Sequence, residues 1–144
     1  MPDDAQTLVV DASVAAKLWF EEHHSELADR VLKSGSRLVA PDLLLIEVAS
    51  IAAKRVRRGL SPAGEATNAM VASKSFLDET ETSAKFVDRA FELACNHGLS
   101  VYDGVYLALA EARRAPLITA DNTLVTKARA AGLDHLVRSL VDVA

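Results

Sequence analysis

Short apolar runs alternate with longer amphipathic segments along this chain. The runs TLVVD, RLVA and PLITA have the length and continuous hydrophobicity of buried strands, and each precedes a segment with helical periodicity. HLVRSL has the pattern of a last edge strand, and LDETETS fits either a short strand or an exposed loop. This alternation predicts an α/β fold in which a mostly parallel sheet carries helices on both faces.

Prolines, glycines and hydroxyl residues set the expected helix boundaries. Pro41 is expected to begin a helix, and Ser61 is expected to cap the helix whose first residue is Pro62. The expected helices span residues 12–20, 22–33, 41–58, 62–76, 84–96, 100–114 and 122–131. No linker or repeat divides the sequence, so we expect residues 1–144 to form a single domain.

Composition and charge narrow the class of protein. Of the 144 residues, half are hydrophobic and only 5% are aromatic, which favours a helix-rich α/β protein. The single cysteine, Cys95, excludes an internal disulfide, is expected in the core and fits a cytoplasmic protein. The acidic start MPDDAQT lacks a signal sequence, and no apolar run is long enough to span a bilayer. A net charge of −4 argues against non-specific coating of nucleic acid, but it does not exclude a metal-dependent nuclease.

Four acidic residues lie beside apolar segments that are far apart in the sequence: Asp11, Glu47, Asp103 and Asp121. A charge in such a place is costly to bury unless it is paired, hydrogen-bonded or bound to a metal. Open parallel sheets bind ligands beyond the carboxyl ends of their strands, where Asp11 and Asp121 both fall. If the fold brings the four together, they suit a hard divalent cation such as Mg²⁺ and phosphodiester hydrolysis.

Each acid also has a structural explanation to weigh. Asp11 and Asp121 could cap the helices that follow them, and Asp103 completes a capping-box pattern with Ser100. Glu47 differs, because it lies in mid-helix on an apolar face, where neither capping nor the helix dipole explains a carboxylate. Glu47 is therefore the acid whose position favours a functional role most strongly.

Several polar residues near these acids could support them. Ser13 could hydrogen-bond the Asp11 carboxylate or a bound water, and Thr119 and Asn122 flank Asp121 and could do the same. One basic cluster stands out, formed by Lys54, Arg55, Arg57 and Arg58. It could contact phosphates, but a role as cations at a helix C-terminus is favoured, because the cluster is short and has no aromatic partners.

The four acidic fragments occur in one order, VVDASV, a Glu inside the helix after the second strand, YDGVYLALA and LITAD. From about residue 8 to about residue 137, the chain resembles the PIN domain, and particularly the VapC-type toxins of toxin–antitoxin pairs. The resemblance implies a three-layer α/β/α sandwich and an endoribonuclease, a hydrolase that depends on Mg²⁺ or Mn²⁺. It implies that Asp11 and Asp103 bind the metal directly, while Glu47 and Asp121 hold its waters or a second metal. Ser13 matches the hydroxyl residue that the family has two positions after its first acid.

The same resemblance implies partners. They are a cognate antitoxin that neutralises the toxin, an RNA substrate (a tRNA, rRNA or mRNA), and a second copy of the chain in a homodimer. Two alternatives stay open at this point. The chain could be a PIN-domain nuclease that acts in RNA processing or on DNA outside a toxin pair, or a non-catalytic PIN-like interaction module.

Overall fold

A five-stranded parallel sheet forms the centre of the computed structural model, which describes residues 6–143. The acidic start of the chain, at residues 1–5, and residue 144 lie outside the described residues, so they test neither the signal-sequence nor the full-length domain expectation. The strands are β1 (Thr7–Val10), β2 (Arg37–Pro41), β3 (Glu79–Glu81), β4 (Leu117–Thr119) and β5 (Val137–Ser139). Their order is β3-β2-β1-β4-β5, and every pairing is parallel.

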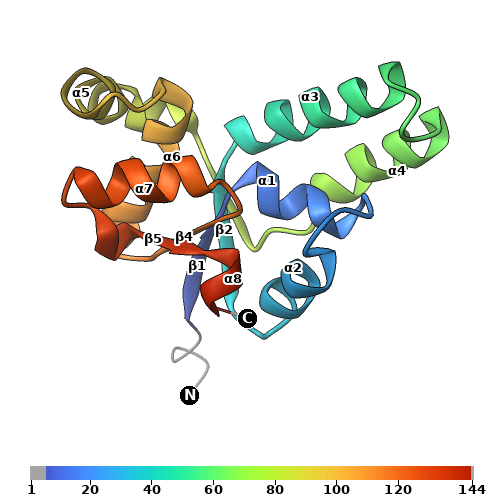
Figure 1. Cartoon of the computed structure of the whole chain (residues 1–144), viewed down its shortest axis with the longest axis horizontal. Helices are drawn as coiled ribbons and strands as arrows, with labels where there is room; N and C mark the ends of the chain where they lie inside the picture. The colour runs from blue at the N-terminus through green and yellow to red at the C-terminus, as the bar shows by residue number, and fades with distance from the viewer. Residues whose placement is uncertain (1–5, 144) are drawn as a thin grey trace.

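Helices fill the connections between the strands. They are α1 (Ala12–Ala15), α2 (Ser25–Leu32), α3 (Leu43–Arg57), α4 (Ala63–Ser73), α5 (Val87–His97), α6 (Val101–Arg113), α7 (Asn122–Ala130) and α8 (Leu140–Val143). Single 3₁₀ turns follow α1, precede α5 and precede β5, at residues 16–18, 83–86 and 134–136. The predicted three-layer α/β/α architecture is confirmed, because the helices cover both faces of the sheet (Figure 1).

The chain adds strands first on one side of β1 and then on the other, and this change places the helices in two layers. From β1 the chain moves to β2 and β3, and it then returns across the sheet to β4 and β5. Because parallel crossovers are right-handed, helices α1 to α4 lie on one face and α5 to α7 lie on the other. Figure 1 shows the two helical groups on either side of the strands, with α3 and α4 extending away together as an antiparallel pair. The carboxyl end of β1 therefore lies where the two layers separate.

The core explains why β1 and α6 occupy the centre. Residues 8–10 of β1 are buried, as expected for a strand covered on both faces. Helix α6 is buried continuously from Gly104 to Ala110, so it packs as an internal helix rather than an amphipathic surface helix. A smaller cluster joins the 3₁₀ turn after α1 to the α3–α4 pair through Phe20, Ala52 and Ala69.

Some local predictions were wrong, because tertiary contacts override the sequence signals. Pro41 ends β2, where it pairs with Glu81, and α3 begins only at Leu43. Ser61 does not cap α4, because its hydroxyl accepts a hydrogen bond of 2.9 Å from Arg55 Nε, and Pro62 is the N-cap residue. Cys95 is exposed on α5 rather than buried in the core.

Helix boundaries elsewhere agree with the predictions to within a few residues, although α2 starts at Ser25 instead of residue 22 and α4 ends at Ser73 instead of residue 76. The uncertain LDETETS segment contains strand β3 at one edge of the sheet, and the predicted last strand is β5 at the other edge. Among the helices that the structure describes, none combines the length and apolar character needed to cross a membrane.

Candidate active site

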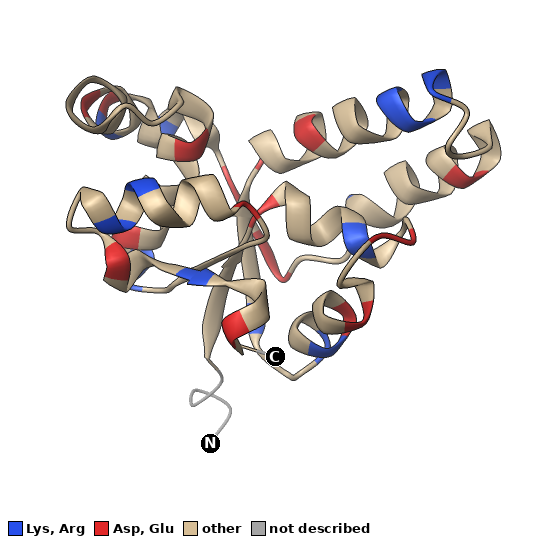
Figure 2. Ribbon diagram, in the orientation of Figure 1, with Lys and Arg blue, Asp and Glu red and all other residues tan. Residues whose placement is uncertain are grey.

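The four acidic residues line one open cavity of about 270 Å³, although they come from four separate segments. Asp11 follows β1, Glu47 lies in α3, Asp103 lies in the first turn of α6, and Asp121 precedes α7. Figure 2 shows acidic residues gathered where the ends of α3 and α6 approach the carboxyl ends of the central strands. The fold thus concentrates negative charge at the point where its two helical layers separate.

Asp11 is the most deeply buried of the four, with 8% of its surface exposed. Two hydroxyl groups donate hydrogen bonds to its Oδ2 atom, Thr119 Oγ1 at 2.6 Å and Ser13 Oγ at 3.1 Å. Burial raises the pKa of the Asp11 carboxyl, while the hydrogen bonds from these two hydroxyl groups oppose the rise. Thr119 and Ser13 therefore fix the orientation of a carboxylate that the fold keeps away from bulk water.

The side chain of Asp121 caps a helix, whereas the side chain of Asp11 does not. Asp11 is the N-cap residue of α1, yet its side chain makes no capping hydrogen bond. Asp121 does cap α7, because its Oδ1 accepts hydrogen bonds from the backbone of Thr123 at 2.9 Å and Leu124 at 3.2 Å. Capping accounts for one oxygen of Asp121 and for neither oxygen of Asp11.

Glu47 reaches the cavity from α3 and is accompanied by a buried tyrosine. Its Oε1 atom and the Tyr106 hydroxyl are both buried, and neither forms a hydrogen bond within residues 6–143. Burial raises the pKa of Glu47, the nearby Tyr106 hydroxyl lowers it, and the charges of Asp11 and Asp103 raise it further. Unpaired buried oxygens are rare, so this pair of oxygens has unused capacity to bind a ligand.

Asp103, in the first turn of α6, is the third site carboxyl whose pKa is raised. Burial and the charge of Asp11 raise its pKa to about 6. Its backbone nitrogen donates to Ser100 Oγ at 3.0 Å, which is half of the predicted capping box. Within residues 6–143 the Ser100 nitrogen donates no reciprocal hydrogen bond to the Asp103 carboxylate, so the Asp103 side chain lines the cavity instead of capping the helix.

These carboxylates are not arranged as a finished metal site. Within the described part of the chain, no group of three or more Asp, Glu, His or Cys side chains has a geometry that could hold a metal ion. The donor set nevertheless fits a hard divalent cation, since it offers carboxylate oxygens only, and Glu47 Oε1 is buried without a partner. The cavity is thus chemically suited to such an ion, and small side-chain movements would be needed to bind it.

The supporting residues separate into two groups. Ser13 and Thr119 contact Asp11, and Thr119 also accepts a hydrogen bond of 3.0 Å from the Asp121 nitrogen, which ties the two strand ends together. Asn122 is exposed at the start of α7 and is not among the residues that line the cavity. The structure therefore gives Ser13 and Thr119, but not Asn122, a contact with the carboxylates.

Two further residues belong to the site and were not assigned to it from the sequence. Tyr106 lies three residues after Asp103 on α6, a spacing that places both side chains on the same face of a helix. Lys54 lines the cavity from α3, seven residues after Glu47, although the basic cluster that contains it was assigned to helix stabilisation. Helical spacing from the acidic residues was the signal that could have found both.

Comparisons with known proteins agree with this geometry. The PIN domain family matches residues 8–130. Over 122 residues, the chain is 39% identical to Ribonuclease VapC3 of Pyrobaculum aerophilum, which covers 83% of this chain and 93% of that protein.

Solved structures show the same fold at lower identity. The Mycobacterium tuberculosis toxin VapC20, described as cleaving the sarcin–ricin loop, superposes with a TM-score of 0.66 at 20% identity, covering 87% of this chain and 95% of that one. A toxin–antitoxin complex from Klebsiella pneumoniae gives a TM-score of 0.62 at 19% identity, covering 92% and 97%. With the family match over most of the sequence, these findings establish that the chain belongs to the PIN-domain family, in its VapC group.

Proposed function

We propose that this protein is the toxin of a type II toxin–antitoxin pair and acts as a metal-dependent endoribonuclease. The observation that carries the proposal is the convergence of four carboxylates from four distant segments on one open cavity. A related ribonuclease is 39% identical to this chain over 122 residues, which supports RNA as the substrate. The whole chain, residues 1–144, acts as one catalytic domain in this proposal.

Mg²⁺ or Mn²⁺ is the ion that the donor set fits. Asp11 and Asp103 would hold it directly, while Glu47 and Asp121 would hold its waters or a second ion. When bound, the ion would lower the pKa of a water and neutralise charge on the scissile phosphate. Water is the nucleophile in this proposal, because the hydroxyls of Ser13 and Thr119 are already engaged with Asp11.

The protein's own groups prepare the site for this chemistry. The hydrogen bonds from Ser13 and Thr119 hold Asp11 in one orientation, so its carboxylate would bind a ligand with little reorganisation. Because burial and Asp11 raise the pKa of Asp103 to about 6, Asp103 releases a proton when a cation binds in mildly acidic solution. Cation binding and ionisation of Asp103 are thereby coupled.

The partners follow from the charge of the cavity. An arginine or lysine of a cognate antitoxin would be attracted to the four carboxylates and could pair with one of them bidentately. Ile46 and Tyr102 are 69% and 62% exposed beside Glu47 and Asp103, and they offer apolar contact area next to the cavity. A related fold occurs in a toxin–antitoxin complex, which supports such a partner. We also propose that the toxin is a homodimer and acts in the cytoplasm.

The test is cleavage of RNA by purified, metal-stripped protein. Total RNA should stay intact in EDTA and be cut after Mg²⁺ or Mn²⁺ is added, with product ends that carry a 5′-phosphate and a 3′-hydroxyl. Calcium should bind but support little turnover, because its looser coordination positions water less strictly. Asp11→Asn and Asp103→Asn should each abolish cleavage in folded protein.

Three outcomes would contradict the proposal in different ways. Full activity in EDTA would exclude the metal mechanism, and wild-type rates in either Asn variant would exclude the residue roles. Cleavage of single-stranded DNA at the same rate as RNA would point to a nuclease outside the toxin class.

A further inference from the structure

We infer that Lys54 binds a phosphate of the RNA that neighbours the phosphate being cleaved, and so sets where the strand lies across the site. This inference rests on the proposed ribonuclease function and deepens it, because it names the group that orients the substrate. Four kinds of observation carry it: the lining of the cavity, the geometry of α3, the absence of a partner for Lys54, and the charge of the site.

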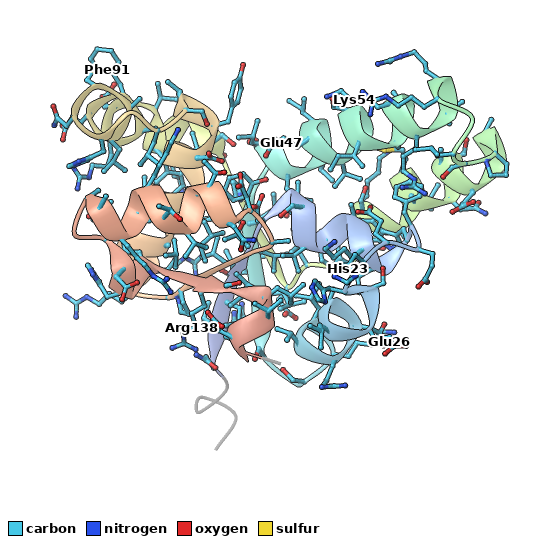
Figure 3. The ribbon with its side chains drawn as sticks, in the orientation of Figure 1. His23, Glu26, Glu47, Lys54, Phe91 and Arg138 are labelled. Carbon is cyan, nitrogen blue, oxygen red and sulfur yellow. The ribbon has the colours of Figure 1, made fainter. Side chains whose placement is uncertain are left out.

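Lys54 lies on the same face of α3 as Glu47. The residues of α3 that line the cavity are Glu47, Ser50, Ile51 and Lys54, which recur at the three- and four-residue spacing of one helical face. Seven residues separate Glu47 from Lys54, or about 10 Å along the helix axis. Figure 3 shows the two labelled residues along α3, with Glu47 nearer to α6 and Lys54 farther out along the helix. Lys54 therefore lies at the rim, beyond the carboxylates.

The ammonium group of Lys54 is not engaged elsewhere in the part of the chain that the structure describes. No carboxylate within residues 6–143 lies within 4.0 Å of it, and it donates no side-chain hydrogen bond there. Its neighbour Arg55 contrasts with it, because Arg55 bonds Ser61, lies 4.8 Å from the centre of the Phe20 ring and is 3.9 Å from Glu22. The basic cluster thus divides into a structural arginine and an exposed lysine directed to the cavity.

The other two members of the cluster, Arg57 and Arg58, do not line the cavity. Arg57 lines a separate, mostly apolar groove between α3 and α4, and Arg58 follows the end of α3 without lining the cavity. Lys54 is consequently the one cation among the residues described as lining this cavity.

The negative charge of the cavity means that the proposed RNA substrate needs a cation at the rim in order to bind. The four carboxylates repel an incoming RNA backbone, and a bound divalent cation offsets that repulsion only at the phosphate it contacts. The next phosphate along the strand needs a cation of its own, and an ammonium on a flexible stem can follow a backbone without reading its sequence. Lys54 supplies that charge on the α3 side of the cavity, so the strand runs outward along α3.

The experiment uses a short RNA that spans a cleavage site mapped in the total-RNA assay. The RNA is made in versions that carry one uncharged methylphosphonate linkage at successive positions. Cleavage in Mg²⁺ is compared for the wild type, Lys54→Ala, Lys54→Arg and the control Arg57→Ala, which removes the same charge from the same helix away from the cavity. Binding is measured over a range of salt concentrations in Ca²⁺.

We expect Lys54→Ala to raise KM about tenfold, the weight of one charge-assisted contact, with a smaller change in kcat. Its salt dependence of binding should be shallower by about 0.7 in the logarithmic slope, the value for one phosphate on a single strand. Arg57→Ala should match the wild type, and Lys54→Arg should recover most of the loss. At one linkage, the methylphosphonate should impair the wild type but not Lys54→Ala.

Two results would overturn the inference while leaving the ribonuclease in place. One is a Lys54→Ala enzyme with the KM and salt slope of Arg57→Ala. The other is additivity of Lys54→Ala with the methylphosphonate at every position, which would mean that Lys54 acts on the carboxylates and not on a phosphate. A wild type that cuts no RNA would overturn the proposed function and this inference together.

Discussion

Asp11 and Asp121 occupy equivalent places in the fold but serve different purposes. Both residues follow a central strand and precede a helix, yet only Asp121 uses its side chain as a cap. The difference lies in their hydrogen-bond partners, because the Asp11 carboxylate accepts from the hydroxyls of Thr119 and Ser13, whereas the Asp121 carboxylate accepts from the backbone of α7. At the scale of the residue, hydroxyl partners decide whether a strand-end aspartate stabilises a helix or faces a ligand.

Asp103→Asn is expected to stabilise the metal-free protein in neutral solution. The folded-state pKa of Asp103 is about 6 and its ordinary value is 3.8, so between these values the native state binds more protons than the unfolded state. The free energy of unfolding of the wild type should therefore fall as the pH rises through this window and stay level above it. With allowance for solvent screening, the variant should gain about 1–2 kcal/mol near neutrality and nothing near about pH 4.

Urea denaturation at the two pH values measures this difference. The control is Asp88→Asn, which removes an exposed carboxylate of α5 that lies outside the cavity. Mg²⁺ should reverse the order in neutral solution, since it stabilises only the protein that binds it. Equal stability of variant and wild type in neutral, metal-free buffer would show that burial and the charge of Asp11 do not destabilise the ionised Asp103 carboxylate.

At the scale of the element, the position of Asp103 depends on how closely α6 approaches α5. Gly104 follows Asp103 directly, and a Cβ atom there would lie 2.9 Å from the Cα and the carbonyl oxygen of Ala90. Such distances are too short for an ordinary contact, so any side chain at position 104 must push the two helices apart. Because residue 104 has no side chain, the first turn of α6 can pack closely against α5. This close packing fixes the position of Asp103.

Gly104→Ala should destabilise the fold and impair catalysis together. Overpacking at a buried site costs about 1–3 kcal/mol, which outweighs the gain of up to about 1 kcal/mol from the better helix propensity of alanine. Gly64→Ala in α4 is the matched control, because nothing lies within 4 Å of a Cβ there, and it should stabilise the protein slightly. Thermal unfolding and the cleavage rate measure both effects; a Gly104→Ala protein as stable and as active as Gly64→Ala would refute the packing argument.

The sequence was sufficient for the elements that local patterns define. The apolar runs of β1, β2 and β4 and the glycine after α5 marked their elements because those signals are short-range. Pro41 was misassigned since its partner is Glu81, forty residues away on the edge strand β3, and no local signal carries that pairing. In the same way, the strand ends placed Asp11 and Asp121 together, but the contact of Tyr106 with Glu47 depends on how α3 and α6 are rotated against each other.

At the scale of the whole molecule, negative charge is concentrated at one place on a chain with a net charge of only −4. The opposite flank of the sheet carries balanced pairs, in which Arg113 joins Glu79 and Glu81 and holds the short edge strand β3 against α6. The acidic residues of β3 are therefore paired with a basic side chain of the same protein, whereas the carboxylates of the cavity are available to an external cation. An inhibitor of the toxin can recognise the cavity by its concentrated negative charge.

We expect the antitoxin to insert a basic side chain among the four carboxylates while apolar contacts supply most of its affinity. Replacing that Arg or Lys with Ala should restore part of the RNase activity in the purified complex, even where binding survives. The matched control is an antitoxin Ala substitution at a basic residue outside the contact. An antitoxin that lies far from all four acids and inhibits equally well after the substitution would contradict this expectation.

The hydrogen bond from Thr119 to Asp11 joins residues that are 108 positions apart, and this has a consequence for how the protein is made. A ribosome synthesises the chain from its N-terminus at roughly 5–20 residues per second. Asp11 is translated well before Thr119, so it lacks its shortest hydrogen bond until β4 has been made, and Asp121 is added after that. A nascent chain therefore cannot assemble the four carboxylates until the segment that follows β4 has been translated.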